Sequence, residues 1–399
     1  MKILFLQDDF PPQSFGGAGI SAYELALEMK KAGHEISVIT TCRNQNEEGK
    51  TDYDGLTVFK IASNYSERWR WYLSLYNCGV VKKVEKILSE LSPDVVHVHN
   101  IHTHLSYYSL KLAKRHARAT VMTFRDVMAF SFAKLDTKKY LENQDVKVTW
   151  LDQIRQAGKR WNPFRNIIIR HYLKYADRKF AISYALKDAL AQNGINDVEV
   201  IYNGINVSEW KASDEEVKDF KKKHQLENKK VIFFNGRLSP AKGSEQALEA
   251  VRLVRKEFSE AVLLVAGTGN MEPREGLIFT GWLDREEIKL AYTASDLVLM
   301  PSVCFDAFGR VNIEAMASKK PIIGTRFGGT PEIVEDGQTG YIVNPLYPEQ
   351  IAEKTLILLK NPERAKQFGQ VGYARAQKCF NLHDKAIEYQ SIYLYLCSS

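Results

Sequence analysis

Two cations stand close together in the second half of the chain, directly after a short apolar run. The run Val231–Asn235 is followed by Gly236 and Arg237, with Lys242 five residues further on. A guanidinium and an ammonium group held side by side bind a diphosphate through charge-assisted hydrogen bonds. A P-loop is a poor match, because that motif places its glycine before the lysine. The remaining alternative is a pair of surface charges beside the next helix.

Two carboxylates flank the expected start of a later helix. Asp306 follows the apolar run Leu297–Met300, and the helix is predicted to begin near Phe308 or Gly309. Its first N–H groups carry partial positive charge and would suit a leaving diphosphate. Glu314 lies more than one turn inside the helix, where a carboxylate can accept both hydroxyl hydrogen bonds of a ribose. The alternative is a helix N-terminal acid and an exposed glutamate.

A glycine-rich loop follows the first apolar run, Ile3–Leu6. Gly16 and Gly17 come just before a predicted helix, and residues 17–22 match the dinucleotide pattern G-x-G-x-x-[G/A]. The match is weak, since the glycines come about ten residues after the strand and not in a tight turn. No carboxylate ends the second strand, where Arg43 would at best suggest NADP. We expect phosphate or sugar contacts here, and a flexible connecting loop is the alternative.

Four histidines gather in the segment HVHNIHTH, namely His97, His99, His102 and His104. A metal site is one interpretation, but no cysteine or acid cluster accompanies them and two of them end a strand. The segment is therefore predicted to form the wall of an acceptor cleft.

Short apolar runs alternate with helical patterns along the whole chain, which is typical of βαβ units with parallel sheets. The predicted architecture is two doubly wound α/β domains that face a central cleft, with ligands at the carboxyl ends of the strands. The first domain comprises residues 1–205 together with a C-terminal helix, 382–399, and the second comprises 206–381. The predicted strands are Ile3–Leu6, Ile36–Thr40, Val95–Val98, Thr120–Phe124, Phe180–Ser183, Val198–Tyr202, Val231–Asn235, Val262–Ala266, Leu277–Thr280, Leu297–Met300, Pro321–Gly324 and Tyr341–Val343.

The composition is that of a folded globular protein, with 45% hydrophobic and 26% charged residues. No apolar run reaches the roughly 20 residues that cross a bilayer. The start, MKILFLQDDF, is too short for a signal-peptide core and is predicted to be a strand. The five cysteines form no CxxC pair, which indicates reduced thiols and a cytoplasmic protein.

The net charge of +7 is concentrated in residues 131–180, where twelve Lys and Arg face five Asp and Glu. Apolar residues recur there at near-helical spacing, with an interruption at Pro163. They are Ile154, Ala157, Trp161, Phe164, Ile167, Ile168, Tyr172 and Tyr175. A basic amphipathic helix can lie on an anionic membrane, although such a stripe can equally pack into its own domain. Nucleic acid is not expected as a partner, because no recognised binding fold accompanies the charge.

Several segments, in order and over nearly the whole chain, resemble the retaining glycosyltransferases of family 4, which have the GT-B fold. They are GGAG, PDVVHVHN, NGRLSPAKG, AGTGN, DAFGRVNIEAMA and GGTPEIVEDGQTGYIV. The resemblance implies transfer of a sugar from a nucleotide-diphosphate sugar to a hydroxyl of a glycan or lipid-linked acceptor, in the synthesis of cell-surface polysaccharide or glycoconjugate. It implies retention of the anomeric configuration, with no metal or other cofactor.

The same resemblance implies a role for each motif. Arg237 and Lys242 would hold the diphosphate, Glu314 the ribose, and Asp306 the donor sugar. Gly16 and Gly17 would approach the phosphate and sugar from the first domain, and Asn100 and His102 would meet the acceptor. The remaining donor contacts would come from Gly236, Gly267, Gly269, Asn270, Gly281, Ala307, Phe308 and Gly309.

Two departures from the family pattern bear on catalysis. Asp306 stands where the family has a glutamate, and Arg125 stands where many members have a histidine near the reacting sugar. Arginine is not a base at neutral pH, but it can stabilise a phosphate or a sugar hydroxyl. A non-catalytic nucleotide-sugar-binding protein is therefore a second hypothesis, and an NADP oxidoreductase, which requires cofactor binding at residues 17–22, is a third.

Overall fold

The computed structural model describes residues 1–13, 16–269 and 274–398. The chain divides into two compact units. Unit 1 consists of Met1–Leu135, Val146–Gly204 and Leu382–Ser399, and unit 2 of Asp136–Asp145 and Ile205–Asn381. The segment 136–145 thus packs with unit 2, although the sequence places it inside the first domain. Each unit is described by itself.

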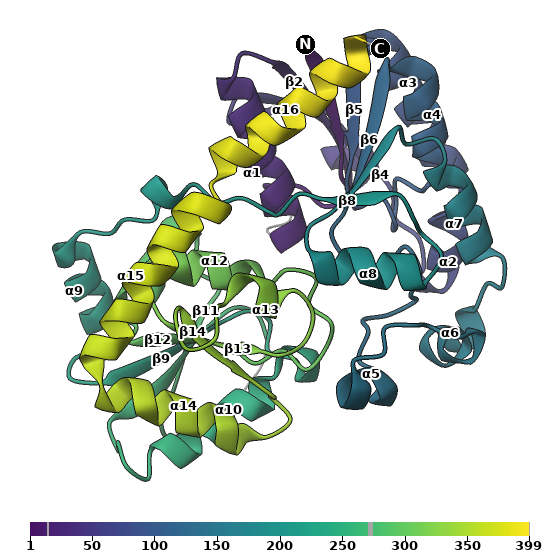
Figure 1. Ribbon diagram of the computed structural model, residues 1–399. Helices are drawn as coiled ribbons and strands as arrows, with labels where there is room; N and C mark the ends of the chain where they lie inside the picture. The colour runs from purple at the N-terminus through teal and green to yellow at the C-terminus, as the bar shows by residue number, and fades with distance from the viewer. Residues whose placement is uncertain (14–15, 270–273, 399) are drawn as a thin grey trace. The chain divides into compact units, whose positions relative to one another are not determined.

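Unit 1 is built on an eight-stranded sheet of order β3-β4-β2-β1-β5-β6-β7-β8. Figure 1 labels β2, β4, β5, β6 and β8 of this sheet. All neighbouring strands pair in parallel except β3 and β4. The strands are β1 (Lys2–Leu6), β2 (Glu35–Cys42), β3 (Gly49–Tyr53), β4 (Leu56–Ala62), β5 (Val95–Val98), β6 (Ala119–Phe124), β7 (Arg178–Ala181) and β8 (Val198–Val200).

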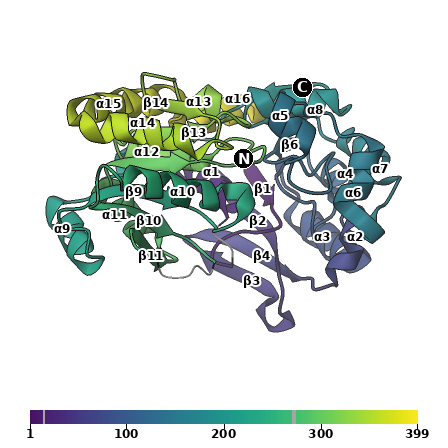
Figure 2. The same cartoon turned by 90° about the horizontal axis from the view of Figure 1, so that it is seen from below.

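The hairpin β3–β4 at the edge of this sheet is absent from the predicted elements (Figure 2). Its turn is Asp54-Gly55, and both residues have positive φ, 50° and 72°. An Asp-Gly pair between two strand-forming segments is a strong hairpin signal, because glycine adopts this backbone conformation without steric cost. The Asp54-Gly55 pair in the sequence was therefore sufficient to predict this hairpin.

Helices cover both faces of the unit 1 sheet. Helices α1 and α16 pack together on one face, and α3, α4 and α7 lie on the other (Figure 1). The first face buries apolar residues of α1, the central strands and α16 in one core, including Phe5, Ala26 and Tyr393. The helices are α1 (Gly17–Lys31), α2 (Arg70–Leu73), α3 (Cys78–Leu91), α4 (Tyr108–His116), α6 (Trp150–Ala157), α7 (Arg165–Leu173), α8 (Tyr184–Gln192) and α16 (Leu382–Ser398).

Unit 2 holds a six-stranded parallel sheet of order β11-β10-β9-β12-β13-β14. The order corresponds to the 3-2-1-4-5-6 arrangement of dinucleotide-binding folds. Successive strands are added on one side of β9 and then on the other, so the strand order reverses between β9 and β12, here called the reversal point. The strands are β9 (Lys230–Asn235), β10 (Ala261–Ala266), β11 (Leu277–Gly281), β12 (Leu297–Met300), β13 (Ile322–Thr325) and β14 (Gly340–Val343). Every strand predicted for this half of the chain is present.

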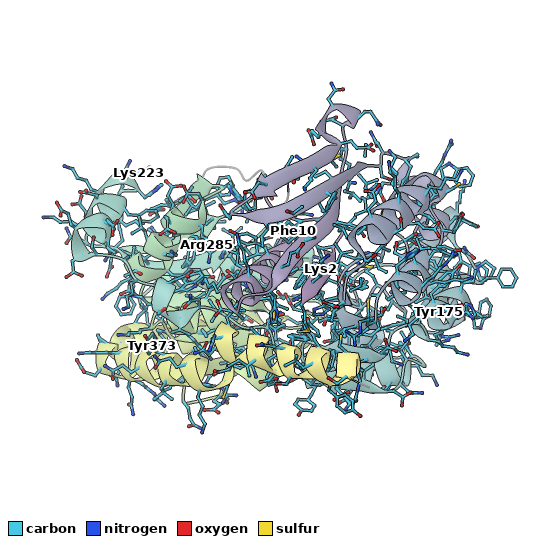
Figure 3. All side chains as sticks on the ribbon, turned by 90° about the horizontal axis from the view of Figure 1, so that it is seen from above. Lys2, Phe10, Tyr175, Lys223, Arg285 and Tyr373 are labelled. Carbon is cyan, nitrogen blue, oxygen red and sulfur yellow. The ribbon has the colours of Figure 1, made fainter. Side chains whose placement is uncertain are left out.

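The unit 2 sheet also has helices on both faces, with α10 and α14 on one side and α12 on the other (Figure 1). Helix α11 packs against α9 and β9, and Figure 3 labels Lys223 on α9 and Arg285 on α11. The helices are α5 (Lys138–Asn143), α9 (Asp214–Lys223), α10 (Ser244–Val254), α11 (Arg285–Ala294), α12 (Arg310–Ala317), α13 (Thr330–Ile333), α14 (Pro348–Lys360) and α15 (Pro362–Cys379).

The basic segment 131–180 does not form one interrupted helix. It contains α5, α6 and α7, and the first of these belongs to unit 2. Two of these helices have a recognisable start. Thr149 forms a capping box with Asp152 at the start of α6, and Pro163 lies just before α7. Within the described residues, no helix is both long enough and apolar enough to span a membrane.

Candidate functional site

In unit 2, the predicted phosphate-binding residues lie at the reversal point of the sheet. Arg237 and Lys242 follow β9, and Asp306–Gly309 follow the neighbouring strand β12. In parallel α/β sheets, ligands bind in the crevice outside the carboxyl ends of strands at this point. The topology therefore brings together two motifs about 65 residues apart in the sequence.

Lys242 and Asp306 form an ion pair across this point. The Lys242 Nζ donates to Asp306 Oδ2 at 2.5 Å. The side chains are 36% and 16% exposed, so the lysine remains accessible to a ligand. Asp306 raises the pKa of Lys242. Burial opposes ionisation of Asp306, but Lys242 and the backbone N–H groups of Phe308 and Gly309 outweigh it and hold the pKa of that carboxyl below its usual value.

Helix α12 starts where the sequence predicts, but the N–H groups at its start are not open. The helix begins at Arg310 with Gly309 as its N-cap, and the Gly309 N–H donates to Asp306 Oδ1 at 3.0 Å. The N–H groups at Phe308 and Gly309, expected to be open to a diphosphate, thus already face a carboxylate. Asp306 acts as a helix N-terminal acid, which was the alternative interpretation of this residue.

Glu314 is buried, with 9% of the residue exposed, and not an exposed glutamate. Its Oε1 accepts from Arg310 Nε at 2.8 Å, and its Oε2 accepts from the Tyr292 hydroxyl at 2.8 Å and from Asn235 Nδ2 at 3.4 Å. A carboxylate offers about four acceptor positions, so three are already used. Burial and the Glu314 charge raise the pKa of Tyr292, which keeps its hydroxyl proton in place.

Glycines allow the loops of this site to touch. A Cβ on Gly243, at φ +73°, would lie 1.9 Å from the Pro301 carbonyl oxygen. A Cβ on Gly267 would lie 2.1 Å from the oxygen of Gly236. The loops after β9, β10 and β12 are therefore in backbone contact, and Lys242 is anchored beside Asp306 because of it.

The predicted base-binding region lies on the loops after β10 and β11. Gly267, buried, donates its N–H to the oxygen of Gly281 at 2.9 Å, while Gly269 is exposed. Asn270 lies outside the described residues. Ala307 and Phe308 are buried at 7% and 2% exposure, so only their backbone is placed to meet a ligand. Arg237 is exposed beside Gly236.

The glycine-rich loop of unit 1 leads into α1. Gly16 is the N-cap and Gly17 the first helical residue, both are exposed, and no side chain caps the helix. No described atom lies within 4 Å of the position of a Cβ on Gly17. Packing therefore gives no reason for a glycine here, which is consistent with close approach of a ligand.

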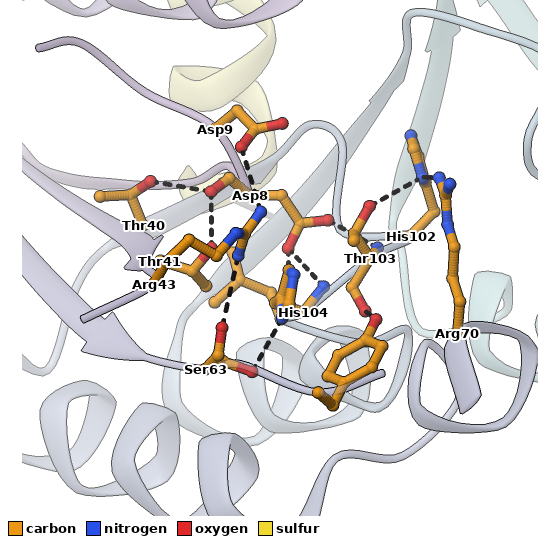
Figure 4. Close-up of polar contacts among 12 residues, drawn as sticks. Asp8, Asp9, Thr40, Thr41, Arg43, Ser63, Arg70, His102, Thr103 and His104 are labelled. Atoms are coloured by element: carbon orange, nitrogen blue, oxygen red, sulfur yellow. Dashed lines mark hydrogen bonds and ion pairs between the residues drawn. The ribbon is translucent and has the colours of Figure 1, made fainter. Parts of the chain in front are cut away.

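Unit 1 has its own reversal point, between β1 and its neighbours β2 and β5. Asp8, at the end of β1, is buried and accepts the backbone N–H groups of Thr103, His104 and Leu105 at 2.7–2.9 Å (Figure 4). Burial raises the pKa of Asp8, although His102 and these N–H groups act against the rise. Asp8 thereby fixes the loop that carries Asn100 and His102.

Asn100 and His102 converge on a third side chain, Asp126. Both donate to Asp126 Oδ2 at 2.9 Å, and Asp126 Oδ1 accepts the Met128 N–H. Burial opposes ionisation of Asp126, but His102 lowers the pKa of its carboxyl below the usual value. In turn, although burial works against the imidazolium, Asp126 raises the pKa of His102. The three side chains, partly exposed, form a polar edge at the carboxyl ends of β5 and β6.

Arg125 is 8% exposed and directed into unit 1. Its Nε donates to His99 Nδ1 at 3.1 Å and its Nη1 to Asn203 Oδ1 at 2.6 Å. Burial and the charge of Arg125 hold the pKa of His97 and His99 well below the usual value, so both imidazoles are neutral. These contacts hold the guanidinium in one orientation.

The histidine segment, predicted to form a cleft wall, lies mostly in the interior of unit 1. His97 and His99 are fully buried, and His104, at 4% exposure, contacts the Ser63 hydroxyl at 2.8 Å. Of the four, His102 alone reaches the partly exposed edge. In the part of the chain that the structure describes, no group of three His, Cys, Asp or Glu side chains is arranged to hold a metal ion.

Several residues of these two sites are absent from the predicted set. Asp126 could have been found from the Arg125-Asp126 pair, and Asp8 from two adjacent acids that begin two residues after a strand. Tyr292 and Asn235 carry no such signal, because a tyrosine in an amphipathic helix and an asparagine at a strand end have many structural roles.

The chain matches two protein-family models, which are adjacent in sequence. "Glycosyltransferase Family 4" covers residues 15–209, and "Glycosyl transferases group 1" covers residues 216–375. An uncharacterized glycosyltransferase of Methanocaldococcus jannaschii is 26% identical over 88% of this chain and 87% of its own length.

Two solved structures share the fold over nearly the whole of both chains. Sucrose-phosphate synthase from Thermosynechococcus elongatus superposes with a TM-score of 0.77 at 18% identity, over 100% of this chain and 99% of that one. Anabaena HepE, solved in complex with UDP-glucose, superposes with a TM-score of 0.71 at 18% identity, over 98% and 99%. With its two parallel α/β units and both family models, the chain belongs to the group 1, family 4 glycosyltransferases of GT-B fold.

Proposed function

We propose that the protein moves a sugar from a nucleoside diphosphate sugar to an acceptor hydroxyl, with retention of the anomeric configuration and without a metal ion. The observation that carries the proposal is the placement of Arg237, Lys242 and Glu314 at the reversal point of the unit 2 sheet. Binding of UDP-glucose by the structurally similar Anabaena HepE supports a donor of this class.

In this proposal, the cations stabilise the charge that develops on the leaving diphosphate. Preorganised charges of this kind are usually the largest catalytic contribution. The Lys242 ammonium has three N–H donors, and its ion pair with Asp306 uses one of them. Asp306 holds the ammonium in place, and a second contact from its carboxylate to the donor sugar stays a prediction.

Glu314 is proposed to accept a ribose hydroxyl at its remaining acceptor position. Its hydrogen bonds to Arg310, Tyr292 and Asn235 fix the orientation of the carboxylate before the nucleotide arrives. To accept both hydroxyls of a ribose, Glu314 would release its longest contact, the 3.4 Å bond from Asn235. The backbone around Gly267 and Gly281 is proposed to contact the base.

The acceptor is proposed to bind at the polar edge of unit 1, against Asn100 and His102. Arg125 cannot remove the acceptor proton, because a guanidinium stays protonated. The diphosphate that leaves is therefore proposed to take that proton, and Arg125 to stabilise charge or a sugar hydroxyl. Gly16 and Gly17 are proposed to approach the phosphate and sugar.

A lipid-linked acceptor is favoured by one surface of unit 1, the α2–α7 surface, formed by the exposed side chains of Trp69, Tyr72, Phe164 and Ile167. Their exposed fractions are 49%, 46%, 65% and 58%. The Tyr72 hydroxyl donates to the Trp161 oxygen at 3.4 Å, which places the end of α2 beside the start of α7. Exposed Lys159 and Arg160 precede this start. Aromatic and basic residues together suit an anionic membrane face, here proposed to be the cytoplasmic one.

Thermal unfolding with UDP, GDP, ADP, CMP and NADPH tests the donor site. A ligand that binds only the folded state raises the melting temperature. One nucleoside diphosphate is expected to raise it in the wild type and clearly less in Lys242→Ala. The matched control is Lys223→Ala on helix α9, which removes the same charge from an exposed ion pair with Glu287 of α11. An equal shift in all three proteins would contradict the role of Lys242.

Turnover separates the enzyme from the non-catalytic alternative. With the nucleotide identified, its sugar conjugates are incubated with the protein and extracted lipid-linked or glycan acceptors. Release of the nucleoside diphosphate together with a glycosylated product supports transfer, whereas donor binding without consumption supports a binding protein. A shift with NADPH alone would favour the oxidoreductase hypothesis.

A further inference from the structure

The segment 136–145 is an arm that leaves unit 1 after Leu135, packs into unit 2 and returns to unit 1 at Val146. Its helix α5 is capped by the Thr137 side chain, which accepts the Tyr140 N–H. Two ion pairs lie within the arm, Lys138 with Glu142 and Lys139 with Asp145. With three acids and two lysines, the arm is not part of a basic partner surface.

Tyr140 is the anchor of the arm. It is 2% exposed, and its ring lies 5.8 Å from that of Phe305 and 5.5 Å from that of Phe327, measured between centroids. Phe305 directly precedes Asp306 in the loop after β12, and Phe327 directly precedes Gly328 in the loop after β13. The tyrosine thus sits where the two loops meet.

Its hydroxyl makes one specific contact with the second loop. The Gly328 N–H donates to the Tyr140 oxygen at 2.8 Å. Burial raises the pKa of Tyr140, so the hydroxyl is neutral at ordinary pH. Among the described residues, the Tyr140 oxygen is the acceptor that the partly buried Gly328 N–H reaches.

The two loops are also joined directly at Asp306. Gly328 has φ +68°, and a Cβ there would lie 2.0 Å from the Asp306 carbonyl oxygen. The next N–H, of Gly329, donates to that same oxygen at 2.9 Å. The contacts run from Tyr140 through Gly328 to the backbone of Asp306, whose carboxylate holds Lys242.

We propose that Tyr140 is a positioning residue of the donor site, through which an arm from the first half of the chain sets the geometry of Asp306 and Lys242. The inference rests on the proposed function, because it takes Lys242 to be a diphosphate ligand. The inference implies that donor affinity depends on Tyr140, a residue proposed to act through Asp306 and Lys242 and not by contact with the donor. Without the Tyr140 acceptor, the loop after β13 must turn the Gly328 N–H toward water, and the backbone of Asp306 moves with it.

The test compares Tyr140→Phe with the wild type. Phenylalanine keeps the ring contacts with Phe305 and Phe327 and removes only the acceptor for Gly328. We expect the KM or Kd for the donor to rise by about tenfold, equivalent to about 1.4 kcal/mol. The KM for the acceptor and the melting temperature are expected to stay close to the wild-type values.

Two further variants make the result specific. Lys138→Ala changes an exposed residue of the same helix and is expected to leave donor affinity unchanged. Gly328→Ala, in which the Cβ meets the Asp306 oxygen, is expected to weaken the donor in the same direction as Tyr140→Phe. Amide hydrogen exchange of a peptide that spans residues 325–330 should be faster in Tyr140→Phe, with or without nucleotide.

The outcomes separate the two proposals. If the wild type binds the donor and Tyr140→Phe binds it with equal affinity, this inference is overturned and the proposed function stands. A parallel loss of donor and acceptor affinity together with a lower melting temperature would show a structural role and also overturn it. If the wild type binds no nucleoside diphosphate, the proposed function fails and the inference falls with it.

Discussion

The two carboxylates of the unit 2 site, Asp306 and Glu314, each accept hydrogen bonds from several donors. At position 306 an aspartate is one methylene shorter than the glutamate of the family pattern, and its carboxylate reaches both Gly309 N–H and Lys242 Nζ. Because both donors hold it, the Asp306 carboxylate is a fixed negative charge beside Lys242. Glu314 is held just as firmly, by Arg310, Tyr292 and Asn235. Both carboxylates are thus oriented before a ligand arrives.

The His102–Asp126 pair makes stability depend on pH. The folded-state pKa of His102 is raised, so its contribution is complete below the unfolded value of about 6.5 and is lost as the pH rises through the folded value. The folded-state pKa of Asp126 is lowered, so its contribution is lost only in acid, below its usual value. The pair is therefore expected to stabilise the protein most near pH 5–6.

We expect His102→Gln to lower the free energy of unfolding by about 1–2 kcal/mol at pH 5.5 and by clearly less at pH 8.5. Urea unfolding at the two pH values measures the difference. His171→Gln, an exposed histidine of α7, is the control. A loss for His102→Gln that is the same at both pH values would show that the charge on the imidazole contributes nothing.

Helix α16 is joined to the unit 1 sheet by a buried hydrogen-bond network. The Tyr393 hydroxyl contacts His97 Nδ1 at 2.6 Å, His97 Nε2 contacts Thr123 Oγ1 at 2.8 Å, and Tyr389 contacts Thr123 at 3.0 Å. His97 and Tyr393 are fully buried. The last helix of the chain is thereby tied to β5 and β6, whose following residues include His99 and Arg125.

Tyr393→Phe tests this element. Removal of the hydroxyl leaves a buried imidazole nitrogen without a partner, which we expect to cost about 1–3 kcal/mol in the free energy of unfolding. Tyr395→Phe, on the same helix at 62% exposure, is the matched control and should change stability by less than about 0.5 kcal/mol. Equal values for both variants in urea unfolding would show that the network does not stabilise unit 1.

The charge of the whole molecule is unevenly distributed, and unit 1 receives most of it. Once the arm 136–145 is counted with unit 2, the rest of the segment 131–180 keeps ten of its twelve cations and only two of its five acids. The exposed side chains of the α2–α7 surface belong to the same unit. The proposed membrane contact of this unit rests on its charge and its exposed apolar side chains together.

Vesicle sedimentation tests this role. Wild-type protein is expected to sediment with vesicles of phosphatidylglycerol and phosphatidylcholine at low salt and to be released at high salt, since the Debye length falls from about 30 Å at 0.01 M to about 3 Å at 1 M. Phe164→Ser combined with Ile167→Ser should reduce binding. The control Tyr184→Ser removes an aromatic side chain of 55% exposure elsewhere in unit 1. Failure of the wild type to sediment would favour an acceptor that is not lipid-linked.

Local patterns were sufficient to predict most elements. Buried parallel strands are continuous apolar runs, so β5, β9 and β10 were located almost to the residue, and the motifs at their ends followed. The apolar runs also predicted that Arg237 and Lys242 follow a strand and that Glu314 lies in a helix, as the structure has them. Their roles toward a donor come from the family resemblance and stay predictions. The hairpin β3–β4 was missed although its Asp-Gly turn was visible.

Which side chains contact each other could be learned only from the tertiary structure. A sequence shows that Asp306 and Lys242 both follow strands, but strand order makes those strands neighbours, and burial then makes the carboxylate and the ammonium pair with each other. It shows four histidines within eight residues, but the burial of β5 and its end decides that His97 and His99 are interior. The docking of Tyr140 against Phe305 and Phe327 joins residues more than 160 positions apart. Such contacts depend on packing between distant segments, which leaves no periodic trace in the chain.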